Sequence, residues 1–207
     1  MLELGQVILG VGDLEAATQR IRGLGLEVLD GGVHPGIGTA NRIVPLGRQY
    51  LALLGIVDGE LARRNAIGKA LAAQLGGGDR LVGWSLRTDR LEDLAVELDV
   101  AVEPRRRLRP DGTELAWRAA GVAASIARPW LPFFEEWDDP WRWPGAQPAR
   151  HACRANGIAW LELAPEDESD LARWVGDAAV PMRLVGGEPG LRRVALATPN
   201  GELVLER

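Results

Sequence analysis

The sequence predicts an α+β fold in which repeated βαβββ modules form a curled mixed sheet, a half-barrel cup, with helices on the outside. Two observations lead to this prediction. The order strand, helix, strand, strand, strand occurs three times in 207 residues. The helix of each module also has a candidate N-capping residue and one apolar face. A single module leaves one apolar sheet face bare, whereas two paired modules curl around a concave pocket. The alternative is an α+β domain without internal symmetry.

The first module covers residues 1–58. Its predicted elements are the strand Leu4–Val11, a helix that begins after Asp13 and ends at Gly23, the strand Leu26–Leu29 and the hairpin Asn41–Ile56. The segment His34–Asn41 is rich in Gly and Pro, which indicates a loop. This polar loop carries one of only two histidines and leads into a buried hairpin. We therefore expect it to form a wall of a ligand pocket.

The second module covers residues 79–138 and follows a connector helix within residues 59–78. Its predicted elements are the strand Arg80–Thr88, a helix with Asp89 and Glu92 as a capping-box-like pair, and the strands Ala101–Arg106, Thr113–Ala120 and Leu131–Trp137. Three prolines make residues 139–154 an irregular linker.

The third module covers residues 155–207 and completes what we expect to be a single domain, 1–207. Its predicted elements are the strand Ile158–Leu163, a helix capped by Asp167, and the strands Met182–Val185, Arg192–Ala197 and Glu202–Leu205. The Asn200–Gly201 pair predicts the last hairpin turn. This module could complete the sheet within the chain or pair with the copy in another chain, which would make a homodimer.

Composition and charge limit the partners that we expect. The net charge of −5 argues against a general nucleic-acid binder, which normally carries a basic face. The run Arg105–Arg107 with Arg109 is a local exception, read either as a solvated strand end or as an anion contact. No apolar run approaches the roughly 20 residues that span a bilayer, so no membrane partner is expected. A single cysteine, Cys153, excludes an intrachain disulfide, and we predict a cytoplasmic protein.

Tryptophan is unusually frequent, with eight Trp against one Tyr and two Phe. Four of them fall within fourteen residues, namely Trp130, Trp137, Trp141 and Trp143. Such a cluster either packs two layers together or lines an apolar pocket. In the second case the partner is a small apolar or aromatic ligand.

Several motifs resemble those of a known group of proteins. The opening V-I-L-G-V-G-D-L-E-A-A resembles the first module of the vicinal oxygen chelate superfamily, which includes glyoxalase I, extradiol dioxygenases and bleomycin-resistance proteins. A closer resemblance is to the glyoxalase-like domain family. It rests on G-G-V-H-P-G-I-G-T-A-N-R-I-V-P-L-G, G-W-S-L-R-T-D, R-P-D-G-T-E-L-A-W-R, L-P-F-F-E-E-W and A-N-G-I. The resemblance implies a paired βαβββ cup.

In metal-dependent members of the superfamily, the first and last strands of two modules hold a divalent ion. Carried over to this chain, those positions are Gln6, Ala52 in place of a glutamate, Gly83 or Trp84 in place of a histidine, and Glu135 or Glu136. At most two of the four keep a ligand type, whereas a catalytic ion needs about three protein ligands. We therefore expect no complete metal site and no cofactor, and name Gln6 and Glu136 as the ligands if a divalent metal binds.

Two residues are catalytic candidates. His34 could act as an acid, a base or a hydrogen-bond donor, or could simply hold its loop together. Glu136 matches the family position better than Glu135, and the alternative for it is a salt bridge to an arginine such as Arg118. The candidate ligand-binding residues are Gln6, His34, Gly36, Thr39, Asn41, Arg42, Trp84, Trp117 and Trp137.

Three functions remain open at this level, and whether the chain is an enzyme is one of the open questions. The first is a small-molecule-binding protein with a Trp-lined cup. The second is a divalent-metal-dependent lyase, isomerase or dioxygenase that uses Glu136, Gln6 and His34. The third is an interaction module whose degenerate cup is filled by its own Trp side chains.

Overall fold

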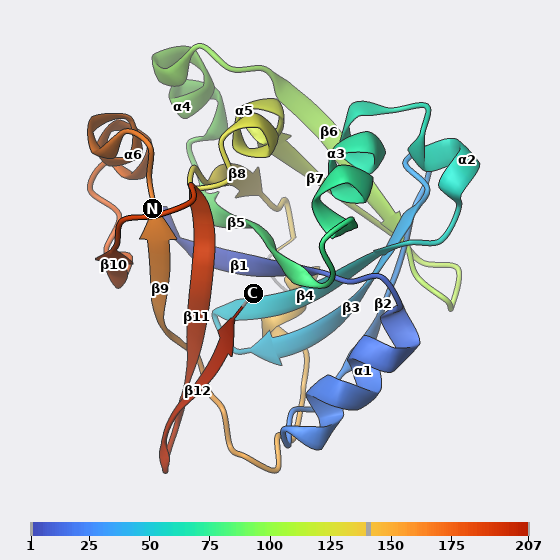
Figure 1. Cartoon of the computed structure of the whole chain (residues 1–207). Helices are drawn as coiled ribbons and strands as arrows, with labels where there is room; N and C mark the ends of the chain where they lie inside the picture. Colours follow the sequence, from blue (N-terminus) through green and yellow to red (C-terminus); the bar gives the residue numbers. More distant parts are fainter. Residues whose placement is uncertain (1, 140–141, 207) are drawn as a thin grey trace.

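Twelve strands form two sheets in the computed structural model, which describes residues 2–139 and 142–206. Eight strands close into a barrel in the order β1-β4-β3-β2-β6-β7-β8-β5, and four form a second sheet in the order β10-β9-β11-β12. Figure 1 shows the second sheet beside the barrel and the helices around the outside. Within the described ranges, no helix has the length and apolar character needed to cross a membrane. The α+β fold predicted from the sequence is confirmed, and its curled sheet closes completely.

The elements follow the predicted order closely. The first half of the barrel consists of β1 (Leu2–Gly10), α1 (Leu14–Gly23), β2 (Leu29–His34), β3 (Thr39–Leu46) and β4 (Gln49–Ile56), followed by α2 (Gly59–Ala62) and α3 (Ala66–Leu75). The second half consists of β5 (Arg80–Thr88), α4 (Leu91–Leu98), β6 (Val102–Leu108), β7 (Glu114–Ala120), α5 (Val122–Ala127) and β8 (Phe133–Glu136). The remainder consists of the short 3-10 helix η2 (Pro144–Ala146), β9 (Ile158–Ala164), α6 (Glu168–Val175), β10 (Met182–Leu184), β11 (Gly190–Thr198) and β12 (Gly201–Glu206).

The two halves of the barrel have the same internal strand order and meet at two seams. In each half the first strand runs parallel to the last, β1 with β4 and β5 with β8. At the long seam β1 pairs antiparallel with β5 from Leu2 to Gly10. At the short seam Val33 of β2 pairs with Leu108 of β6. A Cβ on Gly32, whose φ is +152°, would lie 2.3 Å from the Leu108 carbonyl oxygen, so this approach requires glycine.

The third unit repeats the order of elements but not the topology. Its first strand, β9, lies inside its sheet between β10 and β11, with β12 at the edge. In the barrel halves, by contrast, the first strand pairs with the last strand of its own module. The four strands pair within this chain, and β11 packs against β5 of the barrel. The third unit is therefore a covering sheet and not a third barrel segment.

Three local details differ from the sequence-based expectation. The connector helix predicted within residues 59–78 is two helices, α2 and α3, and α5 was not predicted. The predicted loop His34–Asn41 is only a tight turn at residues 35–38, because β2 extends to His34 and positive φ angles at Gly36 and Gly38 allow the chain to reverse. Helix α4 has Arg90 at its N-cap, and Glu92 forms an ion pair with Arg118 instead of a capping box.

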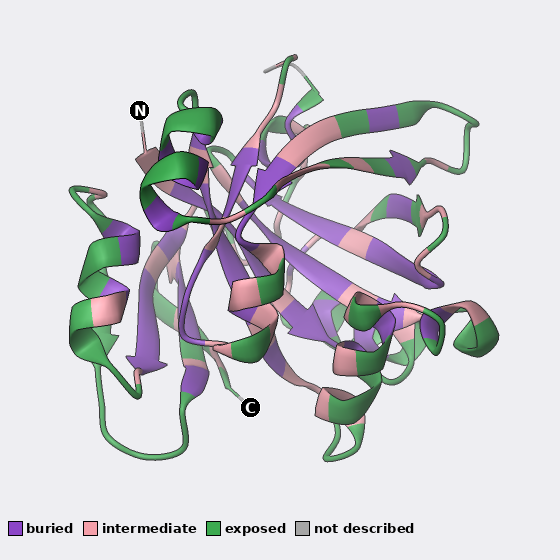
Figure 2. Ribbon diagram, turned by 90° about the horizontal axis from the view of Figure 1, so that it is seen from above, coloured by how far each residue is buried: buried purple, intermediate pink, exposed green. Residues whose placement is uncertain are grey.

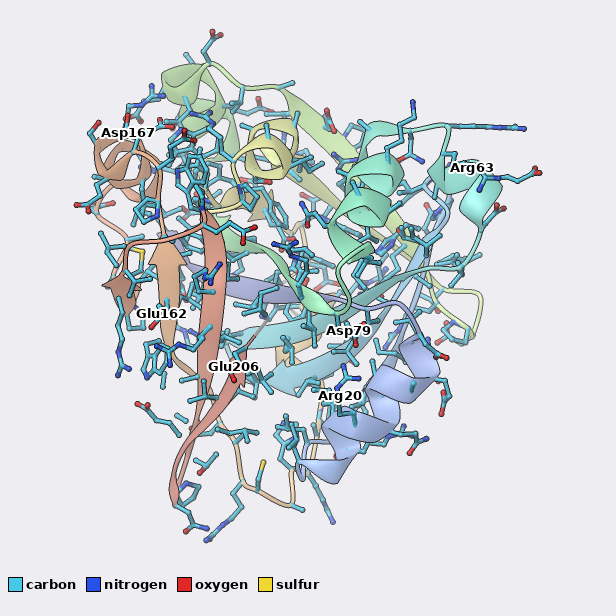
Figure 3. The ribbon with its side chains drawn as sticks, viewed as in Figure 1. Arg20, Arg63, Asp79, Glu162, Asp167 and Glu206 are labelled. Carbon is cyan, nitrogen blue, oxygen red and sulfur yellow. The ribbon has the colours of Figure 1, made fainter. Side chains whose placement is uncertain are left out.

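Apolar side chains on the outer face of the barrel lie under the helices and the second sheet. Figure 2 shows the strands largely buried and the outer faces of the helices exposed. Trp84 is fully buried on this outer face, with its indole N–H donating to the carbonyl oxygen of Trp130 over 3.1 Å. At the surface, Arg20 of α1 lies beside Asp79 (Figure 3), and their side chains form a 2.6 Å ion pair. Because Trp84 and the other core residues pack on the outer face, the barrel interior is lined by a different set of side chains.

Helices α2 and α3 are fixed to the turn between β2 and β3 by Asn65. The Oδ1 atom of Asn65 accepts a hydrogen bond from the Gly68 N–H over 2.8 Å and caps α3. Its Nδ2 group donates to the carbonyl oxygens of Ile37 and Leu61, both over 2.9 Å. A Cβ at Gly38 would lie 2.5 Å from the Asp58 carbonyl oxygen, so the turn and α2 are in close contact. These contacts position one end of the barrel.

We expect Asn65→Ala to lower the free energy of unfolding by about 1–2 kcal/mol, because it removes both the helix cap and the link to Ile37. The measurement is urea denaturation followed by Trp fluorescence. Asn65→Asp keeps the capping oxygen and loses only the donated bonds, so it should be less damaging. Gln19→Ala, which removes an exposed bond to Glu15, is the control and should change stability by less than about 0.5 kcal/mol. An Asn65→Ala protein as stable as this control would contradict the assignment.

Candidate functional site

The barrel interior contains a cavity of about 120 Å³. Successive side chains of a strand point to opposite faces, so every second residue of a barrel strand faces inward. The inward residues that line the cavity are Gln6 and Ile8 of β1, His34 of β2, Thr39 and Asn41 of β3, Tyr50, Ala52 and Leu54 of β4, Arg105 and Arg107 of β6, Trp117 and Ala119 of β7, and Phe133 and Glu135 of β8. Ile37, Ile67, Val122 and Trp137 complete the wall. Both halves of the barrel contribute to it.

Trp143 of the linker closes one end of the barrel. Its side chain is 1% exposed and clusters with inward-facing residues of β3 and β4. The indole N–H donates to the Arg48 carbonyl oxygen over 3.1 Å. The ring meets Tyr50 and Trp137 edge-on, with centroids 5.1 and 5.6 Å away. The rest of the interior is therefore a pocket and not a through channel.

Glu135 is the carboxylate of the cavity and is 1% exposed. One carboxylate oxygen accepts a hydrogen bond from the Gln6 amide, and the other accepts one from the Trp137 indole N–H over 3.4 Å. Burial raises the pKa of Glu135 to about 7, against the opposing effects of these bonds and of Arg107. Burial, with the nearby Glu135 charge, also raises the pKa of Tyr50 well above its usual value. Tyr50 is therefore a neutral phenol, while Glu135 titrates near neutral pH.

Arg107 brings a positive charge into the same cavity. The residue is 4% exposed, and its NH1 group donates to Asn41 Oδ1 over 3.3 Å. Burial lowers its pKa from the usual value, but a guanidinium remains charged in a protein. Burial and the Arg107 charge lower the pKa of His34 to about 4, so this imidazole is neutral at pH 7. Its Nδ1 atom lies 2.9 Å from Thr39 Oγ1.

Aromatic rings form one side of the cavity. Trp117 and Trp137 are stacked with their centroids 4.9 Å apart and an angle of 2° between their planes. Trp137 continues this contact to Trp143 at the closed end. An apolar wall with a few inward polar groups is typical of small-molecule sites.

Six of the ligand-binding candidates line this cavity, namely Gln6, His34, Thr39, Asn41, Trp117 and Trp137. Gly36 lies in the turn before β3, and Trp84 is in the core outside the barrel. Arg42 faces outward and forms a 3.3 Å ion pair with Asp30. Trp141, the remaining member of the predicted Trp cluster, lies outside the described residues.

The structure places Glu135, and not Glu136, in the cavity. Glu136 points outward and forms an ion pair with Arg118, the alternative that the sequence left open. The two residues are adjacent on a strand, so a shift of one residue in register exchanges their faces. Sequence reasoning also missed Tyr50 and the inward direction of Arg107. The spacing of Arg105 and Arg107, two residues apart on one strand face, was the available signal for the latter.

The residues in this cavity do not fit a divalent metal. The facing positions on β1, β4, β5 and β8 are Gln6, Tyr50, Ser85 and Glu135, with Gln6 in register with Tyr50 and Ser85. Tyr50 and Ser85 offer neutral hydroxyls. The Gln6 amide nitrogen donates a hydrogen bond to Glu135, so the two side chains are not arranged to coordinate one ion together. Across residues 2–139 and 142–206, no three His, Cys, Asp or Glu side chains converge as metal ligands would. The charge of Arg107 further disfavours a bound cation.

Comparison with known proteins gives one family and several similar folds. A family model described as a glyoxalase-like domain matches residues 7–179. A hypothetical protein from Staphylococcus aureus aligns over 100% of this chain and 99% of its own, with 12% identity and a TM-score of 0.71. A catechol 2,3-dioxygenase aligns over 98% of this chain and 86% of its own, with 13% identity and a TM-score of 0.50. Both likenesses concern the fold alone.

A methylmalonyl-CoA epimerase from Mycobacterium tuberculosis aligns over 64% of this chain and 85% of its own, with 16% identity and a TM-score of 0.44. Among proteins of curated function, none matches the chain. The comparisons therefore do not identify a reaction or a ligand.

The raised pKa of Glu135 predicts a stability difference that depends on pH. Between about pH 4.5 and 7 the folded protein keeps a proton on Glu135 that the unfolded chain has lost. The stabilisation from this group is thus complete below pH 4.5 and is lost as the pH rises to 7. Glu135→Gln cannot ionise. Its free energy of unfolding should therefore rise relative to the natural protein by on the order of 3 kcal/mol across this interval, and then level off.

Urea denaturation at intervals from about pH 5 to 8 measures this difference. The lowered pKa of His34 makes the protein more stable as the pH rises towards about 6.5. The natural protein and Glu135→Gln share this effect, so it cancels in the difference between them. A difference that stays constant from pH 5 to 8 would show that Glu135 is not held protonated by burial.

Proposed function

Because the chain belongs to the glyoxalase-like domain family, we propose that it binds a small molecule with an apolar or aromatic body inside its barrel. The resemblance stated from the sequence is confirmed by the family match, and this proposal adds what the family alone does not specify. It concerns the cavity lined by β1, β2, β3, β4, β6, β7 and β8.

The observation that carries the proposal is the open volume between Trp137 and α3. The tryptophans of the described barrel do not fill it, because Trp143 occupies only the closed end and Trp84 lies outside. About 120 Å³ remains, several times the roughly 10–15 Å³ that a water molecule needs. The interaction-module alternative requires a cup filled by its own side chains. This volume favours binding.

An enzyme of the same superfamily is the second candidate, and Glu135 is the observation that favours it. A cavity carboxyl with a pKa of about 7 is suited to accept or donate a proton at neutral pH. Glu135 would then take the role first considered for Glu136. His34 is a weaker base at this pH because its pKa is about 4. Such a reaction would use proton transfer by Glu135, since the donor set does not fit a divalent ion.

We propose further that the protein binds its ligand in a reducing compartment such as the cytoplasm. Cys153 is the single cysteine and is partly buried as a free thiol. A structure without disulfides suits such a compartment.

The first test uses 2-naphthol, a neutral aromatic probe, and quenching of Trp fluorescence. We expect saturable binding to the natural protein. Ala119→Leu should weaken this binding by about tenfold or more, because Ala119 lines the cavity and a larger side chain fills it. Ala116→Leu is the matched control, since Ala116 lies on the exposed face of the same strand. Both variants keep all the tryptophans. Equal binding by the two variants would place the ligand elsewhere and refute the proposed site.

A second test measures metal content. The purified, untagged protein is exposed to Zn, Ni, Mn and Fe, dialysed, and analysed by plasma mass spectrometry. We expect far less than one ion per chain, because Gln6 and Glu135 hydrogen-bond to each other and the described residues include no cluster of acidic, His or Cys ligands beside them. About one tightly bound ion per chain would overturn this expectation and make a metal-dependent enzyme the leading function.

A further inference from the structure

The wall of the cavity contains a buried cation, Arg107, that is not ion-paired with a carboxylate of the described residues. Among residues 2–139 and 142–206, the Arg107 side chain makes one hydrogen bond, to Asn41, and its Nε–H group has no partner. Within the described part of the chain, it forms no ion pair within 4.0 Å with a carboxylate. A buried charge without a partner costs free energy, because the group has left water and gained no anion.

The neighbouring arginines show that this feature belongs to one position. Arg105 forms an ion pair with Glu103, and Arg106, on the outer face, lies 3.7 Å from Glu114. Arg109 donates to Gln147 over 3.3 Å. Of these four arginines, Arg107 alone is deeply buried and has an unpartnered N–H group.

The acidic group of the cavity does not balance this charge. Both oxygens of Glu135 accept hydrogen bonds from other residues, Gln6 and Trp137. Burial also keeps Glu135 largely protonated below about pH 7. A ligand anion would supply both the missing charge and the missing acceptor, and a carboxylate matches the planar guanidinium well.

A second cavity continues the first towards helices α3 and α5. It has about 110 Å³ and shares five lining residues with the first, namely Ile8, Leu54, Ile67, Val122 and Phe133. It extends between the barrel wall and the helices α3 and α5, and none of the described residues that line it is charged. Figure 1 shows these two helices next to each other against one side of the barrel. The combined space is therefore polar and cationic at one end and apolar at the other.

We propose that the molecule bound in the barrel is an amphiphilic monocarboxylate. Its carboxylate lies on Arg107, and its apolar tail passes Ile8 and Leu54 and ends in the second cavity under α3 and α5. This inference rests on the proposed function, because it names the chemical class of the molecule that the barrel binds.

Gly83 of β5 offers a way to close the tail end alone. It lines the second cavity, and a Cβ built on it would have Ile8 Cδ1, 4.0 Å away, as its nearest neighbour. A leucine there would occupy the tail space without contacting Arg107. Arg107→Met removes the charge at the other end while keeping an unbranched apolar side chain. Arg106→Met is its control, with the same change of charge on the outer face of the same strand.

The test is calorimetric titration with octanoate and octan-1-ol at about pH 6, where the probe is ionised and Glu135 is mostly protonated. We expect octanoate to bind the natural protein at least about tenfold more tightly than octan-1-ol, because its carboxylate forms charge-assisted hydrogen bonds that the alcohol cannot form. Arg107→Met should remove this preference by weakening octanoate alone, and Arg106→Met should keep it. Gly83→Leu should weaken octanoate more than butanoate.

Equal affinity for octanoate and octan-1-ol in the natural protein would overturn the inference, whether or not the variants fold. The same holds if neither alkyl probe binds while 2-naphthol does, and the proposed function would then stand. Failure of 2-naphthol to bind as well would overturn both. A preference for octanoate that survives in Arg107→Met would also contradict the assignment of the head group.

Discussion

Closure of the barrel at its two seams determines what its interior contains. An eight-stranded barrel is just wide enough to be filled by side chains or to hold one small ligand. In this chain Trp143 fills one end, and small side chains such as Ala52 and Ala119 leave space in the rest of the interior. Closure depends on close contacts as well as on hydrogen bonds, because Gly32 lets β2 approach β6. The cavity therefore results from the number of strands, from Trp143 at one end and from the small residues that line the interior.

The same closed interior shifts the charges of the groups inside it. Low polarity disfavours charge, so His34 and Glu135 are both held towards their neutral forms, while an arginine keeps its charge. Apolar residues at these positions would avoid the cost of burying Arg107 and Glu135. Polar groups that weaken a fold in this way are most often found at functional sites. Their placement together in one cavity is what distinguishes this site from an ordinary barrel core.

The sequence predicted the elements well because turns and helix ends carry strong local signals. Gly23 and Gly25 at the end of α1 and the Asn200–Gly201 turn are examples. Which residues face inward was harder to predict, since a β-bulge or a shift of one residue reverses the faces of a strand. For this reason the sequence favoured Glu136 for the site, whereas Glu135 lines the cavity. Arg107 looked like a surface residue because charged strand residues usually face water. The third unit shows that equal element order does not fix strand order, which depends on long-range pairing that no local pattern encodes.

The long seam between β1 and β5 joins two halves that each form only part of the cavity wall. Gln6, His34 and Tyr50 come from one half, and Arg107, Trp117 and Glu135 from the other. A molecule in the cavity would therefore touch both halves at once and act as a bridge between them. Because separation of the halves would destroy its site, its binding free energy would be added to the work of opening the barrel. Occupancy of the cavity by a ligand would therefore increase the resistance of the barrel to mechanical opening.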